Sequence, residues 1–231
     1  MFRNSGYYFV ALLGAAVAAF WPRYIARPAA QIDAYTHAHA AAMVSWCGLL
    51  IAQPFLVRAG RLSFHRNLGV LSYGVAPAVV VSSLLLAHYR FRSMDEGTFS
   101  SEARNLYLPL SAIVLFTLAY VCGVLYRREP ERHARFMICT SLTMVDPVLG
   151  RILAFYFPPL PVDLYYQALT YGSTDLILLG LAFQDRDRAR GRQVFLVMLA
   201  SFVTAHVLWF SWAQSAGWRP IADWFRRISL T

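Results

Sequence analysis

The side chains that most readily support chemistry here are six histidines, two of which lie one residue apart in the stretch Tyr35-Thr36-His37-Ala38-His39. A neutral imidazole binds haem iron, zinc or copper and exchanges protons near neutral pH. Successive residues of an α-helix are about 100° apart, so His39 shares a face with Gln53 whereas His37 points to the opposite side. We therefore expect His39 to be the functional member of the pair. Both histidines could bind one ion only where the backbone is irregular, which Asp33 and Thr36 would permit as cap residues.

Other polar side chains lie inside or at the ends of long apolar stretches. A polar group in lipid is costly and is therefore a candidate for function. Sorted by depth, these side chains form three layers. The outer layer holds His39, His88 and Arg151, the middle layer Asp146, Asp175 and His206, and the inner layer Gln53, His65 and His133.

Two histidine layers near opposite faces are the arrangement that a transmembrane electron path needs. Haem b in membranes is held between two imidazoles on neighbouring helices. His39 with His88 would form an outer pair, and His65 with His133 an inner pair. Arg151 is the candidate contact for a haem propionate or another anion. The leading expectation is thus a haem b protein that serves electron transfer or a redox-linked step.

A zinc or copper ion is an alternative cofactor, held by His39 and His37 with an outer carboxylate or His88. With a water-activating base from the middle layer, such a site would make a metal-dependent membrane hydrolase. The spacing of this pair is not the i, i+4 spacing of helical metal ligands, so the pattern favours this reading less. Cys47, Cys122 and Cys139 are odd in number and form no C-x-x-C pair, so we expect neither a disulfide framework nor a thiolate site.

A third reading needs no cofactor. Arg151 pairs with Asp146 or Asp175 as a buried ion pair, His206 is a core histidine, and the remaining histidines anchor helix ends at the interface. The middle layer would then be structural or would carry protons. The protein itself would be a non-catalytic accessory or assembly subunit. An oligomeric state does not follow from the pattern.

The elements that must position these residues are membrane-spanning helices. The 231-residue chain is 58% hydrophobic and 14% charged, with a mean hydropathy of +0.46, whereas soluble domains carry roughly 25% charged residues. Stretches of about 20 apolar residues cross a bilayer as helix. The predicted spans are 6–22, 35–57, 66–88, 105–126, 134–157, 163–183 and 193–214. We expect an all-α polytopic membrane protein, a seven-transmembrane-helix bundle that forms one domain over 1–231, with 215–231 as an interfacial tail.

Arginine supplies every basic residue other than histidine. The chain has no lysine, which excludes a retinal Schiff base and any lysine nucleophile. By the positive-inside rule, the N-terminus is expected in the cytoplasm and the C-terminus outside. The inner side would carry Arg3, Arg58, Arg61, Arg66, Arg127, Arg128, Arg132, Arg135, Arg186, Arg188, Arg190 and Arg192; the outer side would carry Arg23, Arg27, Arg90, Arg92, Arg104, Arg219, Arg226 and Arg227. The net charge of +9 reflects these flanks and gives no reason to expect nucleic-acid binding.

Several of these residues together resemble an uncharacterised family, with a domain of unknown function, of multi-span bacterial inner-membrane proteins. Its pattern is H-x13-Q, H-R-x-x-G, H-x3-M and a later R. The matching residues are His39 and Gln53, then His65-Arg66-Asn67-Leu68-Gly69, then His133 and Met137, then Arg151. The chain departs from the pattern at Tyr73 and Phe136, where a differently placed or different residue is expected.

The resemblance covers about residues 35–155 and implies a multi-pass protein of the bacterial inner (plasma) membrane. It supports the choice of candidate residues and implies no particular reaction. In architecture only, the chain is also similar to transmembrane b-type cytochromes, which carry electrons with two histidine layers. The expected partners are the lipid bilayer and a membrane redox or assembly partner.

Overall fold

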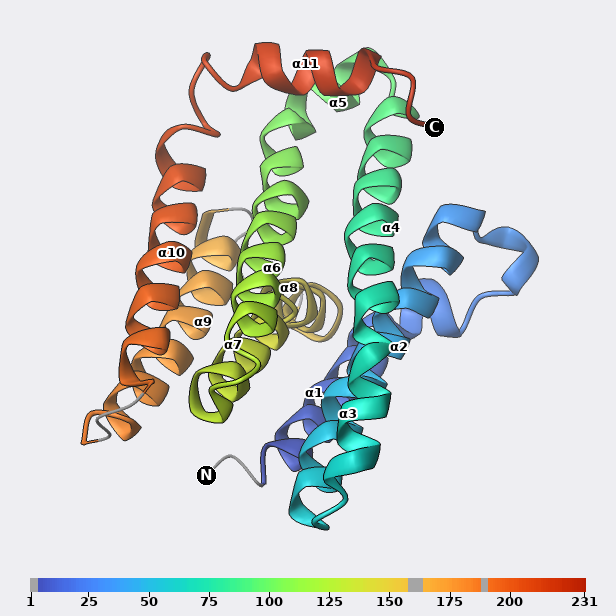
Figure 1. The fold of residues 1–231 in the computed structure, drawn as a ribbon. Coiled ribbons are helices and arrows are strands. Elements are labelled where there is room, and N and C mark those ends of the chain that lie inside the picture. The colour runs from blue at the N-terminus through green and yellow to red at the C-terminus, as the bar shows by residue number, and fades with distance from the viewer. Residues whose placement is uncertain (1–3, 158–163, 188–190) are drawn as a thin grey trace.

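The structure is a computed structural model that describes residues 4–157, 164–187 and 191–231, and within these ranges it contains helices and no strand. This confirms the expected all-α class. Figure 1 shows the helices packed side by side, with the last one lying across one end. The elements are α1 (Ser5–Phe20), a π-helical turn η1 (Trp21–Ile25), the 3-10 turn η2 (Ala29–Gln31), α2 (Ala34–Arg58), α3 (Leu62–Val70), α4 (Ser72–Arg92), α5 (Glu96–Glu102), η3 (Ala103–Leu106), α6 (Tyr107–Leu125), α7 (Pro130–Leu142), α8 (Val145–Tyr156), α9 (Leu164–Gln184), α10 (Arg192–Ser211) and α11 (Arg219–Arg227).

Six continuous or nearly continuous helical segments within the described ranges are long and apolar enough to cross a membrane. They are Ser5–Ile25, Ala34–Arg58, Leu62–Arg92, Glu96–Leu125, Pro130–Tyr156 and Arg192–Ser211. Each overlaps one predicted span. The third and fourth are longer than predicted because α3 continues into α4 and because α5 and η3 precede α6.

The predicted span 163–183 corresponds to α9, which is not among those six helices, so the count of seven is not confirmed. The first half of α9 is rich in polar residues, including Gln167, Thr170 and Asp175, and this lowers its hydropathy. Residue 163 lies outside the described residues, as do Arg3, Arg188 and Arg190 of the inner arginines.

The predicted span 134–157 is interrupted at Thr143 and Met144, where α7 ends and α8 begins. Pro147 accounts for the interruption, because proline has no N–H to donate and its ring clashes with the carbonyl four residues earlier, here that of Thr143. In Figure 1, α8 is seen almost along its axis, whereas α6 and α10 run up the picture. The break therefore turns α8 across the bundle, where it packs against α1 and α9.

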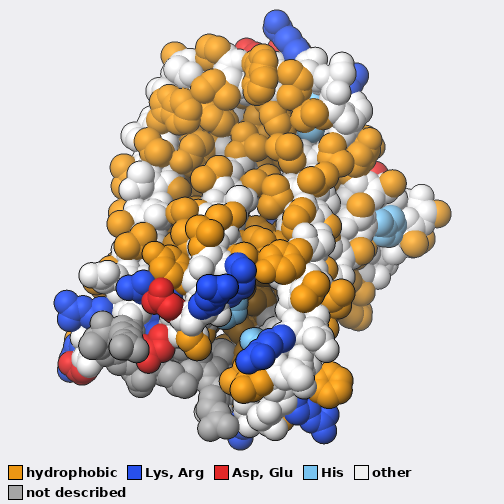
Figure 2. All heavy atoms as spheres, viewed as in Figure 1, with side chains coloured by type: hydrophobic (Ala, Val, Ile, Leu, Met, Phe, Trp, Pro, Cys, Tyr) orange, Lys and Arg blue, Asp and Glu red, His pale blue; other side chains and the backbone are white. Residues whose placement is uncertain are grey.

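An apolar belt covers most of the visible face of the molecule, and charged side chains gather below and above it (Figure 2). Large hydrophobic side chains on several helices are more than half exposed, such as Val114 (65%), Leu125 (70%), Leu176 (68%) and Phe183 (65%). Monomeric soluble proteins rarely expose apolar patches of this extent. The surface is compatible with a bilayer.

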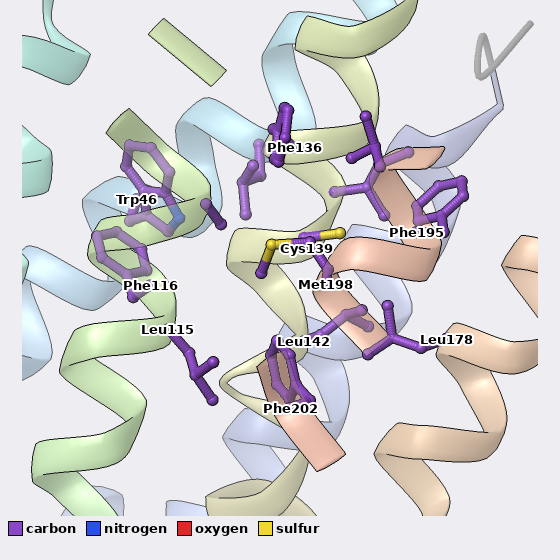
Figure 3. Packing of buried hydrophobic residues seen from close by; sticks show 14 of the residues in the cluster. Trp46, Leu115, Phe116, Phe136, Cys139, Leu142, Leu178, Phe195, Met198 and Phe202 are labelled. Carbon is purple, nitrogen blue, oxygen red and sulfur yellow. The ribbon is translucent and has the colours of Figure 1, made fainter. Parts of the chain in front are cut away.

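The core consists of interlocking apolar side chains from α2, α4, α6, α7, α9 and α10. Trp46 of α2 packs edge-on against Phe116 of α6, with 5.2 Å between ring centroids. Further along, Leu142, Leu178, Met198 and Phe202 point into one cluster (Figure 3). This cluster closes the middle of the bundle.

Short helices close one end of the bundle, which we call the α11 end; the opposite end, with the turns 59–61 and 126–129, is the α3 end. Helix α11 lies across α4, α5 and α6 (Figure 1). The Trp218 indole donates to the Ala103 carbonyl at 2.8 Å, and Arg226 donates to Glu96 at 2.6 Å. The predicted interfacial tail is thus a helix docked on the protein itself.

A buried ion pair fixes the α3 end. Arg135 of α7 donates to Asp185, which follows α9, and their side chains are 0% and 1% exposed. Gly191, which precedes α10, has a left-handed φ of 85°, and a Cβ there would press on the Arg135 guanidinium. Glycine is therefore required at this turn both by the backbone and by the arginine.

Removing one partner of this pair is expected to destabilise the protein strongly. Asp185→Asn leaves a buried guanidinium without its carboxylate and should cost about 3 kcal/mol of unfolding free energy. The double variant Arg135→Met/Asp185→Asn should recover a large part of that loss, because no uncompensated charge remains. Unfolding in detergent mixtures, followed by tryptophan fluorescence, measures both.

The matched control is Glu131→Gln, which removes the exposed second carboxylate near Arg135, 3.9 Å away. A screened surface pair of this kind contributes roughly 0–1 kcal/mol. A loss for Asp185→Asn no larger than that for Glu131→Gln would contradict the structural role of the buried pair.

Candidate functional site

The inner layer predicted from the sequence assembles at the α3 end. His65 lies on α3 and His133 in the first turn of α7, which Pro130 opens. Their imidazoles are close enough to act on each other electrostatically, and His65 also lies beside the backbone of Gln53 of α2. Figure 2 shows a hollow in the lower part of the molecule, with histidine in its wall and arginine at its rim.

The ring nitrogens of the two inner histidines are not used alike. Nδ1 of His133 donates to the Gly123 carbonyl at 2.8 Å, so Nε2 presents a lone pair and has no hydrogen bond from the described residues. Nδ1 of His65 and Oε1 of Gln53 are buried, and neither has a hydrogen-bond partner among the residues that the structure describes. A buried polar atom left without a partner costs about 1–3 kcal/mol. Both atoms are therefore candidate contacts for a ligand.

The middle layer also assembles, from α8, α9 and α10. Nδ1 of His206 lies 3.0 Å from Oδ2 of Asp175. Asp146 accepts hydrogen bonds from Gln167 at 2.7 Å and from Thr170, and it acts electrostatically on His206 and Arg151.

Tyr171 completes this central cluster. Its ring stacks on His206, with centroids 3.8 Å apart and planes at 14°. The residues on α9 that the sequence analysis missed, Gln167, Thr170 and Tyr171, stand eight, five and four residues before Asp175. The i, i+3, i+4, i+8 spacing of one helix face could have revealed them.

Of the three residues in the predicted outer layer, the structure brings His39 close to Arg151 but does not bring His88 to them. His39 lies 3.2 Å from the Ser82 hydroxyl and 3.3 Å from that of Ser83, and Arg151 acts on it electrostatically. Arg151 donates to the Pro147 carbonyl at 2.8 Å and lies over the Phe20 ring. The structure does not bring Arg151 to the inner histidine pair.

His88 is not near His39 but holds the C-terminal segment. It is fully buried, and its two ring nitrogens lie 2.7 Å from Oγ1 of Thr231 and 2.9 Å from the Ile228 carbonyl. The outer pair His39–His88 is therefore not assembled.

His37 is engaged in the same way at the start of α2, with Tyr24 and the Ala29 carbonyl each at 3.1 Å. As predicted, it points away from His39. Asp33 caps this helix through the amide and hydroxyl of Thr36, each at 2.8 Å. Burial acts to raise the pKa of Asp33, but the two bonds from Thr36 and the nearby Arg90 outweigh it and leave that pKa below its usual value.

Within the described ranges, no group of three or more His, Cys, Asp or Glu side chains is placed to hold an ion. The cysteines Cys47, Cys122 and Cys139 are all free thiols, as expected. The zinc or copper site at His37 and His39 is not assembled, because both ring nitrogens of His37 have protein partners.

Comparison of the chain with protein-family models, with curated proteins and with solved structures finds no match.

The geometry predicts a structural role for His88. His88→Ala removes two buried hydrogen bonds and opens a cavity beneath the C-terminal segment, which should cost about 2–4 kcal/mol. Thermal unfolding should shift to lower temperature, and limited proteolysis should cut near residues 228–231 first. His37→Ala, a half-buried histidine with equally occupied nitrogens, serves as control and should change stability by less than about 1.5 kcal/mol. An unchanged unfolding temperature for His88→Ala would contradict this role.

Proposed function

We propose that this protein spans a membrane and binds one haem b between His65 and His133, where it serves electron transfer or a redox-linked step. The observation that carries the proposal is the pair of open ring nitrogens, Nδ1 of His65 and Nε2 of His133, on two neighbouring helix starts. Haem b takes two such neutral nitrogens as axial ligands.

The surroundings of this pair suit the group. The carbonyl of Gly123 fixes the ring of His133 through Nδ1, which is how proteins orient a metal-binding imidazole. Arg66 acts electrostatically on His65 and supplies a cation next to the site for a propionate. Bound haem would supply one-electron chemistry, and the chain would supply its ligands, its orientation and its charge environment.

The proposal includes one haem rather than two. Both ring nitrogens of His88 have protein partners. Of the predicted outer pair, only His39 therefore remains available as a haem ligand. Arg151 then belongs to the central cluster and not to a haem propionate.

The proposed setting is the bacterial inner (plasma) membrane, in agreement with the motif resemblance, with the N-terminus in the cytoplasm. We include α9 as a seventh span, because it packs along α10 over its length and exposes Leu176, Leu179 and Phe183 on its outer side. A cytoplasmic position of the α3 end is supported by the arginines at that end, through the positive-inside rule: Arg58, Arg61, Arg66, Arg127, Arg128 and Arg132.

A metal ion is the second candidate for the same site, and Oε1 of Gln53 favours it. Two imidazoles and an amide oxygen would offer zinc or copper three ligands with no need of a porphyrin. Elemental analysis of the purified protein separates this candidate from haem.

Visible absorption spectra of protein made under haem-replete conditions test the proposal. The wild-type protein should show a Soret band, and His65→Ala and His133→Ala should each reduce bound haem at least tenfold, because each removes an axial ligand. His37→Ala and His39→Ala should retain the band. A protein that folds but carries neither haem nor stoichiometric metal would overturn the proposal and support a non-catalytic accessory or assembly subunit.

Gln53→Leu distinguishes haem from a metal ion at this site. It removes the amide oxygen and keeps the approximate volume, so it should leave the Soret band in place and should abolish binding of zinc or copper. Loss of metal with no haem in the wild-type protein would replace the first candidate by the second.

A further inference from the structure

The central cluster of α8, α9 and α10 has no task in the proposed function. Besides Tyr171, its ionisable members are Asp146, Arg151, Asp175 and His206. We propose that this cluster is a proton-binding site within the membrane, which takes up one proton on His206 by way of Asp146 and Arg151. The proposal does not depend on haem.

Charge balance is the first support. Two carboxylates face one guanidinium, since Asp146 acts electrostatically on Arg151 and on His206, and Asp175 contacts His206. With a neutral imidazole, the cluster carries one negative charge in excess. One proton on His206 makes it neutral, which is the form that a low-dielectric interior favours.

The geometry of His206 fits proton exchange at one atom. Asp175 holds Nδ1 at 3.0 Å, and Tyr171 fixes the ring plane by stacking at 3.8 Å between centroids. Nε2 has no hydrogen bond from the described residues. Nε2 is therefore the atom that gains and loses the proton. The N–H group at Nδ1 remains hydrogen-bonded to the carboxylate of Asp175 throughout.

The elements packed around His206 contribute few other polar groups. From α9 come Asp175 and Tyr171, and from α8 comes Asp146 with Arg151 behind it. From α6 comes Tyr107, whose hydroxyl donates to the Ala205 carbonyl at 3.1 Å. Arg23 and Arg90 also act on Arg151, but both are exposed, so water screens them from the carboxylates.

Asp146 and Arg151 connect the cluster with the surface, since Arg151 is exposed and Asp146 half-buried. Along the bundle axis, Phe202 lies one turn before His206 and Trp209 one turn after it, and each is 2% exposed. Figure 3 shows Phe202 in the apolar cluster with Leu142, Leu178 and Met198. A proton therefore moves from water near Arg151, past the carboxylate of Asp146, to Nε2 of His206, and it returns by the same way.

Solid-state NMR of protein labelled with ¹⁵N-histidine in lipid bilayers tests the charge of His206, because the shifts of the two ring nitrogens differ between imidazole and imidazolium. The signal is assigned by its loss in His206→Gln. At pH 7.5 the wild-type protein should show an imidazolium. Asp146→Asn and Asp175→Asn should each turn it into a neutral imidazole, because one negative charge is removed.

Arg151→Gln is the variant that separates charge balance from mere packing. It increases the excess negative charge, so His206 should stay protonated. His37→Gln controls for unrelated effects and should leave the His206 signal unchanged. A neutral His206 in the wild-type protein, or an imidazolium that survives Asp146→Asn unchanged, would overturn the proposal.

None of these measurements involves the Soret band, so failure of the haem proposal would leave them interpretable.

Discussion

The constraint on which the structure depends is the cost of burying polar atoms among apolar side chains. A buried polar group is stabilised when another part of the protein forms a hydrogen bond with it. The chain meets the constraint by gathering its polar residues into separate clusters: one at the α3 end, one at the centre, and one beside His39. Between the clusters, the interior is apolar and close-packed.

The clusters differ in how many of their polar atoms have a hydrogen-bond partner in the protein. This difference distinguishes residues with a structural role from candidate functional residues. His88 and His37 use both ring nitrogens on protein partners, so their positions are explained by folding. The pair Arg135–Asp185 is likewise explained as a link between α7 and the end of α9. Within the described part of the chain, His65, Gln53 and Asp175 have buried polar atoms with no hydrogen-bond partner, and one ring nitrogen of His206 has none. These residues, whose polar atoms are not all hydrogen-bonded, are therefore the better candidates for a functional role.

Much of this organisation could be predicted from the sequence, because hydropathy and helix periodicity are local properties. The all-α class and the positions of most spans follow from them, and depth along a span was enough to group Asp146, Asp175 and His206. Long-range contacts were not predictable. Nothing near His88 in the sequence indicates Thr231 as its partner, and the direction in which α8 turns after Pro147 depends on α1 and α9, which pack against it. The polar face of α9 was not predicted, because this span was assigned from its apolar residues alone.

The contact between His88 and Thr231 has a consequence for biosynthesis. The two residues are 143 positions apart, and at ordinary translation rates the ribosome needs roughly 7 to 30 s to cover that distance. During this interval α4 is already made while its buried imidazole lacks both partners. The two hydrogen bonds of His88 therefore form long after α4 itself has been synthesised.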